Sequence, residues 1–320
     1  MHRISVCIIA ALSYFAPAVM SAQNICGYGL VSVDAACMRA EPSNASELET
    51  QASYGAPLRL LGRSGEWWRV KMADGYEAYV NESAIAVKDS AEMARWRKSP
   101  RIIVTTPYPT RMYADSIGRS ARNVVCDVTI GAIFEGAVRP GAHYVEAVLT
   151  DGRRGYLRSI EVEDFELWSK QEPHADKILD TAYSMNGVTY LWGGTTPKAL
   201  DCSGLTKVCY LSCGVMLPRN ASEQALSGVE LAVGCPGDFR PGDLLFFGSG
   251  DGDRITHVGI YEGGGRFIHA SGRVFVSSID PADTLYIPRR VLKAVRIIGE
   301  PYSGGTVAVN DHPWYFDSEP

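Results

Sequence analysis

Alternating apolar and polar positions, in short runs, dominate the first part of the chain. Such runs recur between residues 29 and 87, for example at 67–71, and turn-forming pairs such as Asp74-Gly75 separate them. Alternation over five or six residues predicts half-buried β-strands, and Asp-Gly between two strands predicts a tight hairpin. We therefore predict a small antiparallel β domain, similar to bacterial SH3-like domains, over residues 23–90.

A second block repeats this plan over residues 100–163. A strand-like run at 144–148, a turn at Asp151-Gly152 and a further run at 155–157 follow one another in the same order as in the first block. Each copy has about 60 residues, a size at which a small β domain just buries its own core. We interpret the blocks as a degenerate repeat of two SH3-like domains; two unrelated β domains are the alternative. An alanine-rich, charged stretch between them predicts a short helix.

From residue 175 onward the periodicity changes to that of an α+β domain. The predicted elements are two helices and three strands, over residues 175–186, 202–213, 243–247, 256–261 and 266–270. A helix packed on an antiparallel sheet is an α+β arrangement. We assign residues 164–174 to a linker, 175–302 to this domain and 303–320 to a tail.

The first residues have the pattern of an export signal. An apolar run at 6–15 follows a short polar start, and small residues precede Gln23. The run is shorter than the roughly 20 apolar residues that span a bilayer. We predict a signal peptide over residues 1–22 and an exported protein, periplasmic or secreted, with no membrane span after cleavage. A buried N-terminal helix and a membrane anchor are the alternatives.

The amino-acid composition and net charge limit the classes of binding partner that we expect. The 320 residues are 46% hydrophobic and 21% charged, as in ordinary globular proteins, and the net charge of −5 without a basic run argues against nucleic acid. Removal of Cys7 with the signal leaves an odd number of cysteines in an oxidising compartment, so at least one thiol should stay free. We expect this thiol to be Cys202. The pattern does not indicate an oligomeric state.

Cys202 has the surroundings of a nucleophile. Asp201 suits the N-cap of the helix that follows, which places Cys202 in the first turn at the positive end of the helix dipole. This position, together with a nearby imidazolium, is expected to lower the thiol pKa. His257 and His269 lie on neighbouring predicted strands. A three-residue loop at 262–264 would make them direct cross-strand partners, so that His269 orients His257 toward Cys202.

Residue chemistry alone leaves other interpretations open. A lone cysteine is often structural, and a histidine on a strand is often only packed. One cysteine and two histidines are also zinc ligand types, although no fourth ligand has metal spacing.

Five separated motifs then point to a family. The motifs, in chain order, are Tyr190-x-Trp192-Gly193-Gly194, Asp201-Cys202-Ser203-Gly204, Leu217-Pro218-Arg219-x-x-Ser222-x-Gln224, residues 241–247 with the sequence Pro-Gly-Asp-Leu-Leu-Phe-Phe, and the two histidine strands. Together they resemble the NlpC family of cell-wall cysteine peptidases. With two SH3-like domains in front, the chain resembles the dipeptidyl-peptidase VI-like members. This resemblance implies a papain-like domain that cleaves the γ-D-glutamyl bond to a diamino acid in peptidoglycan stem peptides, without a metal or other cofactor.

The resemblance also implies site residues, at the positions of this sequence that match the family's motifs. It implies that Cys202 is the nucleophile, His257 the general base and His269 the group that orients the base. The implied substrate-binding residues are Tyr190, Asp201, Ser203, Asn220 and Tyr76. The alternatives are a non-catalytic cell-wall binding protein and an amidase or acyltransferase on the same fold.

The chain departs from the family at two positions. Members that require a free N-terminal L-alanine have an acidic residue after the Pro-Arg pair and another from the first SH3-like domain. Here these positions are Asn220 and, as the sequence is best matched, Ala56. Two missing carboxylates predict weak selection for the free amine. Trp192 is expected to pack within its loop, and Arg219 to bind either an internal carboxylate or a ligand.

Overall fold

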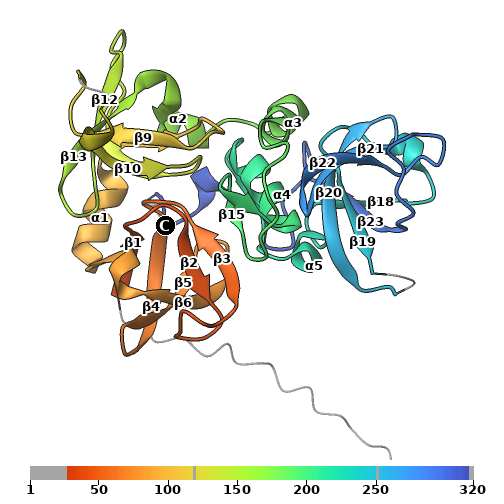
Figure 1. Ribbon diagram of the computed structural model, residues 1–320, viewed down its shortest axis with the longest axis horizontal. Coiled ribbons are helices and arrows are strands. Elements are labelled where there is room, and N and C mark those ends of the chain that lie inside the picture. The colour runs from red at the N-terminus through yellow and green to blue at the C-terminus, as the bar shows by residue number, and fades with distance from the viewer. Residues whose placement is uncertain (1–26, 118–119, 250–251, 317–320) are drawn as a thin grey trace, which may run out of the picture.

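The computed structural model describes residues 27–117, 120–249 and 252–316, so the predicted signal peptide lies outside the described residues. Two antiparallel β domains precede an α+β domain (Figure 1). Within the described ranges, no helix is long and apolar enough to cross a membrane.

Both N-terminal domains are seven-stranded antiparallel sheets. The strands of the first are β1 (Gly27–Val31), β2 (Ala36–Arg39), β3 (Leu48–Ala52), β4 (Pro57–Ser64), β5 (Trp67–Met72), β6 (Glu77–Asn81) and β7 (Ile85–Lys88). Those of the second are β8 (Arg101–Val104), β9 (Thr110–Tyr113), β10 (Val124–Val128), β11 (Ile133–Gly136), β12 (Tyr144–Val148), β13 (Arg154–Arg158) and β14 (Val162–Asp164).

The two sheets share one strand order. It is β3-β2-β6-β5-β4-β1-β7 in the first and β10-β9-β13-β12-β11-β8-β14 in the second, which is the same order when each is counted from its own first strand. The predicted internal repeat is therefore confirmed. The predicted helix between them is α1 (Ser90–Lys98), which begins with a capping box between Asp89 and Glu92.

The C-terminal domain is built on a six-stranded antiparallel sheet of order β18-β23-β19-β20-β21-β22. Its strands are β18 (Val229–Leu231), β19 (Leu244–Gly248), β20 (Ile255–Gly263), β21 (Arg266–Ser271), β22 (Arg273–Ser278) and β23 (Val291–Arg296). The other elements are α2 (Phe165–Ser169), α3 (Ala175–Ser184), β15 (Thr195–Thr196), β16 (Ala199–Leu200), α4 (Cys202–Leu211), β17 (Val215–Met216), α5 (Ala221–Gln224) and β24 (Val307–Ala308).

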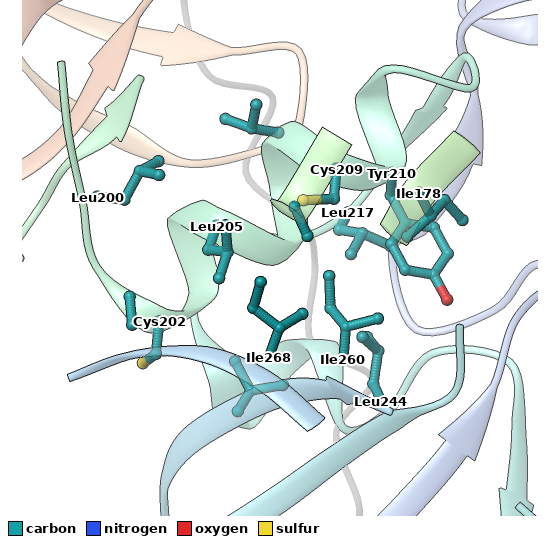
Figure 2. Close-up of a cluster of buried hydrophobic side chains, with 14 of the residues drawn as sticks. Ile178, Leu200, Cys202, Leu205, Cys209, Tyr210, Leu217, Leu244, Ile260 and Ile268 are labelled. Atoms are coloured by element: carbon teal, nitrogen blue, oxygen red, sulfur yellow. The ribbon is translucent and has the colours of Figure 1, made fainter. Parts of the chain in front are cut away.

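Helix α4 packs on this sheet through an apolar core. Leu205 and Cys209 of the helix, together with Ile260 and Ile268 of β20 and β21, are fully buried there (Figure 2). Burial of a large aliphatic side chain contributes about 1.5–3 kcal/mol, so this core holds the helix firmly against the sheet. The first residue of the helix, Cys202, lies at the edge of the core with its sulfur pointing toward the strands (Figure 2).

The first β domain docks beside the start of α4. Thr195 of β15 and Gln51 of β3 exchange hydrogen bonds of 2.9–3.2 Å through backbone and side-chain groups. The adjoining backbone contact is close: a Cβ at Gly193 would lie 2.4 Å from the carbonyl oxygen of Leu48. Strand β3 is therefore held directly against the loop that leads into Cys202.

The C-terminal segment contacts all three domains. Strand β24 pairs with β17, His312 Nε2 lies 3.0 Å from the carbonyl oxygen of Ala73 in the first domain, and the guanidinium of Arg101 on β8 lies over the ring of Phe316 at 5.2 Å from its centroid. Residues 303–316, which the sequence pattern assigned to a tail, thus help to hold the domains together.

Candidate active site

Asp201 caps helix α4, as predicted. Its carboxylate accepts a hydrogen bond from the backbone N–H of Gly204 at 2.7 Å and another from Gly193 at 3.0 Å. The cap satisfies a helix N–H that would otherwise lack a partner, and it joins the helix start to the preceding glycine loop. Cys202, with 7% of its surface exposed, is thereby fixed as the first residue of the helix.

A buried arginine completes this network. Arg219 forms an ion pair with Asp201, donates to the Ser203 hydroxyl at 2.8 Å, and donates from Nε to the backbone carbonyl of Glu49 at 3.0 Å. Ser203 in turn donates to Asp201 at 3.2 Å. Arg219 was expected to bind either an internal carboxylate or a ligand, and in the structure it binds the internal carboxylate of Asp201. The side chains of Asp201 and Ser203, expected to bind substrate, are buried and engaged in this network instead, where they position Cys202.

The two histidines contact each other directly. His257 Nε2 lies 2.7 Å from His269 Nδ1, and both side chains are buried. His269 Nε2 lies 3.0 Å from the hydroxyl of Ser277 on β22, a residue that the sequence analysis missed because no motif includes it. For His257 to accept a proton at Nδ1, its Nε2–H must donate to His269, whose own Nε2–H must then donate to Ser277. Ser277 therefore stabilises the tautomer that a general base requires.

The strand register behind this contact differs from the prediction. His269 pairs with Gly259, not with His257, because a two-residue turn at Gly264-Gly265 replaces the expected three-residue loop. A β-bulge between Tyr261 and Gly263 adds one residue to β20. Turn and bulge together shift the register by two positions, so the histidines remain on one face as diagonal neighbours. Diagonal aromatic side chains still reach each other across a sheet.

The electrostatics contradict the expectation of a lowered thiol pKa. Burial, reinforced by the negative charge of Asp201, raises the pKa of Cys202 to about 11, although the backbone N–H groups of Val258 and Ser203 oppose this. Burial also lowers the pKa of His257 to about 3 and that of His269 to about 4. In the free protein the thiol and both imidazoles are therefore neutral. Within the described ranges, no hydrogen bond joins the Cys202 thiol to an imidazole nitrogen.

The neutral state of Cys202 predicts how the alkylation rate of its thiol depends on pH. Alkylation by iodoacetamide requires thiolate, so its rate at Cys202 should rise by about tenfold per pH unit from about pH 6 to pH 10. The rate is measured by mass spectrometry of the Cys202 peptide, with the peptide of the exposed Cys235 as an internal reference for the reagent. A rate that is already constant from acidic pH would instead indicate a preformed thiolate–imidazolium pair.

Tyr190 borders the thiol. Its phenol is half-buried, and burial, with the negative charge of Asp201 nearby, raises its pKa to about 12. It thus remains a neutral hydrogen-bond donor at physiological pH. Trp192, which was expected to pack within its loop, is 59% exposed instead.

A carboxylate of the first β domain faces this region. Tyr76 donates a hydrogen bond to the half-buried Glu49 of β3, and Asn220 lies within hydrogen-bonding reach of the same phenol. Ala56, the first-domain position named from the sequence, has no carboxylate and does not lie in this contact. Ala56 follows β3, and its carbonyl accepts from Val31 inside the first domain. The N-terminal domain therefore does supply a carboxylate near Asn220.

Comparisons with known proteins agree with this geometry. The sequence profile of the NlpC/P60 family matches residues 187–296, which contain the thiol, both histidines and all six strands of the sheet. The C-terminal domain belongs to the NlpC/P60 family. A second profile, described as the bacterial dipeptidyl-peptidase Sh3 domain, matches residues 38–85. The NlpC/P60 domain is thus that of a cysteine peptidase, and the predicted α+β fold with SH3-like N-terminal domains is confirmed.

Relatives extend over most of the chain. A γ-D-glutamyl-L-lysine dipeptidyl-peptidase of Bacillus cereus is 27% identical over 241 residues, which are 71% of this chain and 68% of the relative. Dipeptidyl-peptidase 6 of Lysinibacillus sphaericus is 28% identical over 258 residues, 77% and 90% of the two chains. The crystal structure of an NlpC/P60 family protein from Bacillus cereus superposes with a TM-score of 0.71 at 22% identity, covering 85% of this chain and all of that one, which supports the fold.

The donor set near the thiol does not form a metal centre. The described part of the chain contains no group of three or more His, Cys, Asp and Glu side chains that could hold a metal ion. Both nitrogens of His269 and one of His257 are engaged in hydrogen bonds within the pair and with Ser277.

Proposed function

We propose that this protein is an exported cysteine endopeptidase that hydrolyses the γ-D-glutamyl bond to the diamino acid of peptidoglycan stem peptides. The observation that carries the proposal is a buried thiol at a capped helix start, within hydrogen-bonding reach of the backbone N–H of Val258 next to His257, together with the ordered His257–His269–Ser277 hydrogen bonds. The similarity to the γ-D-glutamyl-L-lysine dipeptidyl-peptidase of Bacillus cereus supports the choice of bond.

In this proposal Cys202 attacks the γ-carbonyl carbon of D-glutamate. His257 takes the thiol proton as the sulfur–carbon bond forms, and it later donates that proton to the departing amine of the diamino acid. The neutral resting pair suits this order of events, because the proton moves only during attack. The backbone N–H of Cys202 and the phenol of Tyr190 would stabilise the negative oxygen of the tetrahedral intermediate. Water then releases the acyl group, with His257 acting as base again.

The product masses test the bond assignment. A synthetic peptide L-Ala-γ-D-Glu-diamino acid-D-Ala should be converted to L-Ala-γ-D-Glu and a dipeptide that begins with the diamino acid, as read by mass spectrometry. An intact substrate, or fragments cut at another bond, would contradict the proposal.

Glu49 and Tyr76 are the proposed binding site for the N-terminal ammonium of the substrate. A half-buried carboxylate that already accepts from a phenol has lone pairs left for a cation, and Asn220 adds a neutral amide beside it. The prediction of weak amine selection rested on the absence of a carboxylate at both Asn220 and Ala56. Because Glu49 provides one carboxylate, we now expect a clear preference for the free amine.

The preference can be measured with a pair of peptides that differ only in N-terminal acetylation. The native protein should favour the free amine by about tenfold or more in kcat/KM, since one charge-assisted hydrogen bond contributes about 1.5–3 kcal/mol. Glu49→Gln should remove most of this preference, and Asn220→Asp should increase it. Glu47→Gln, at an exposed carboxylate two positions earlier, is the matched control. Equal rates for both peptides in the native protein would exclude this role for Glu49.

A further inference from the structure

An unpaired arginine lies beside the histidine pair, outside the network that holds Cys202. Arg289 is exposed and lies two residues before β23. Its backbone N–H donates to the carbonyl of Ile287 at 2.7 Å, but its guanidinium has no hydrogen bond or ion pair among residues 27–117, 120–249 and 252–316. The next residue, Arg290, forms an ion pair with Asp253. One of two adjacent guanidinium groups is thus left without a partner.

The sheet register brings Arg289 close to the histidines. Val291 of β23 pairs with Phe247 of β19, and Phe247 pairs with His257 of β20. Neighbouring strands are about 4.8 Å apart, so the backbone of Val291 lies about 10 Å from that of His257. Arg289 precedes Val291 by two residues, and its charge contributes to lowering the pKa of both His257 and His269, after burial. The guanidinium therefore acts on the histidine pair through space.

The same arginine lines a groove of about 650 Å³. Phe239, Ile279 and Val291 give the groove an apolar part, and the paired Arg290 and Asp253 line it as well. An apolar surface with one unpaired cation is complementary to a short aliphatic chain that ends in a carboxylate. A chain that ends only in an ammonium would be repelled by Arg289.

The chemistry of the proposed reaction directs one part of the substrate to this place. His257 must donate a proton to the leaving amine, so the diamino acid has to pass beside the histidine pair. The N-terminal amine, in contrast, is assigned to Glu49 of the first β domain. The α-carboxylate of D-glutamate stays on the acyl side of the scissile bond with Cys202. Of the substrate's charged groups on the leaving side, those of the diamino acid are therefore the ones expected near Arg289.

We propose that Arg289 binds the side-chain carboxylate of the diamino acid, so that the enzyme prefers stem peptides with diaminopimelate over stem peptides with lysine. This inference rests on the proposed function and specifies its substrate class. The two diamino acids both carry a side-chain ammonium, and they differ by the carboxylate that Arg289 would bind.

The test compares L-Ala-γ-D-Glu-meso-diaminopimelate with L-Ala-γ-D-Glu-L-lysine. The native protein should cleave the diaminopimelate peptide with a kcat/KM about tenfold or more above that of the lysine peptide. Arg289→Gln should remove most of this ratio, chiefly by slowing the diaminopimelate peptide, and Arg289→Glu should reverse it. Arg240→Gln, at an exposed arginine of the same domain that does not line the groove, is the matched control and should keep the native ratio. Thermal melting checks that each variant is folded.

Three outcomes would overturn the inference. They are equal rates for the two peptides in the native protein, a preference for lysine, or an Arg289→Gln variant in which both rates fall by the same factor. The last result would indicate that Arg289 binds a carboxylate common to both substrates. If neither peptide yields L-Ala-γ-D-Glu, the proposed function fails together with the inference, and the product masses distinguish this case from the others.

Discussion

Cys202→Ala is expected to abolish peptide hydrolysis, with kcat/KM lowered by roughly 10⁴-fold or more. The substitution removes the only atom assigned to attack the scissile carbon, and no other described cysteine lies beside a histidine pair. Cys209 and Cys213 are fully buried in the helix core, whereas Cys235 is exposed on the surface. Hydrolysis is followed by mass spectrometry of the stem peptide digest.

The fold should survive this change. Asp201 caps the helix through its own side chain, and the apolar core continues through Leu205 and Cys209, so loss of one sulfur at its edge leaves both intact. The melting temperature of Cys202→Ala should therefore stay close to the native value. Cys235→Ala serves as the control for removal of a thiol and should keep full activity. Substantial turnover by a folded Cys202→Ala protein would contradict the nucleophile assignment, and a wall-binding role would then gain support.

Local signals carried most of the fold prediction. The Asp-Gly turns, the alternating strands and the capping residue Asp201 act over a few neighbouring positions, so their effects can be read from adjacent residues. The repeat of the first two domains was also recognisable, because the strand order depends on the spacing of such signals. Strands β18, β22 and β23 had no distinctive pattern and were not predicted.

The register of the histidine strands shows where local reasoning stops. Gly263, Gly264 and Gly265 all have positive φ, at +119°, +58° and +80°. Three consecutive glycines permit several turns of similar energy, so their order does not select one. The choice is made by the pairing of β20 with β21 and by the bulge. The face of each histidine was nonetheless predicted correctly, because the register error was an even number of residues.

Contacts between domains could not be predicted from the sequence pattern. Arg219 and Glu49 are 170 positions apart, and they meet only because β3 docks on the loop before α4. For the same reason the sequence pattern pointed to Ala56, and not to Glu49, as the first-domain residue near the substrate amine. The pKa of Cys202 also depends on this packing, since burial outweighs the helix dipole and the backbone donors. The position of Cys202 at the helix start, taken alone, therefore predicted the wrong direction for the shift of its pKa.

The histidines are expected to differ in how much activity each substitution removes. His257→Gln should lose essentially all hydrolysis, by roughly 10³-fold or more, because the amide cannot accept and return a proton. His269→Gln should keep measurable activity, because its side-chain oxygen can still accept from His257 Nε2–H and hold the base in the required tautomer.

Ser277→Ala tests the last hydrogen bond of the His257–His269–Ser277 series. Removal of the hydroxyl frees His269 to adopt either tautomer, so kcat should fall by only about tenfold while KM changes little. Val276→Ala, at the adjacent position of β22, controls for altered packing of the strand. All four variants are compared by kcat and KM on one stem peptide and by thermal melting. Equal and complete losses in His257→Gln and His269→Gln, with both proteins folded, would show that His269 takes part in proton transfer and does not only orient His257.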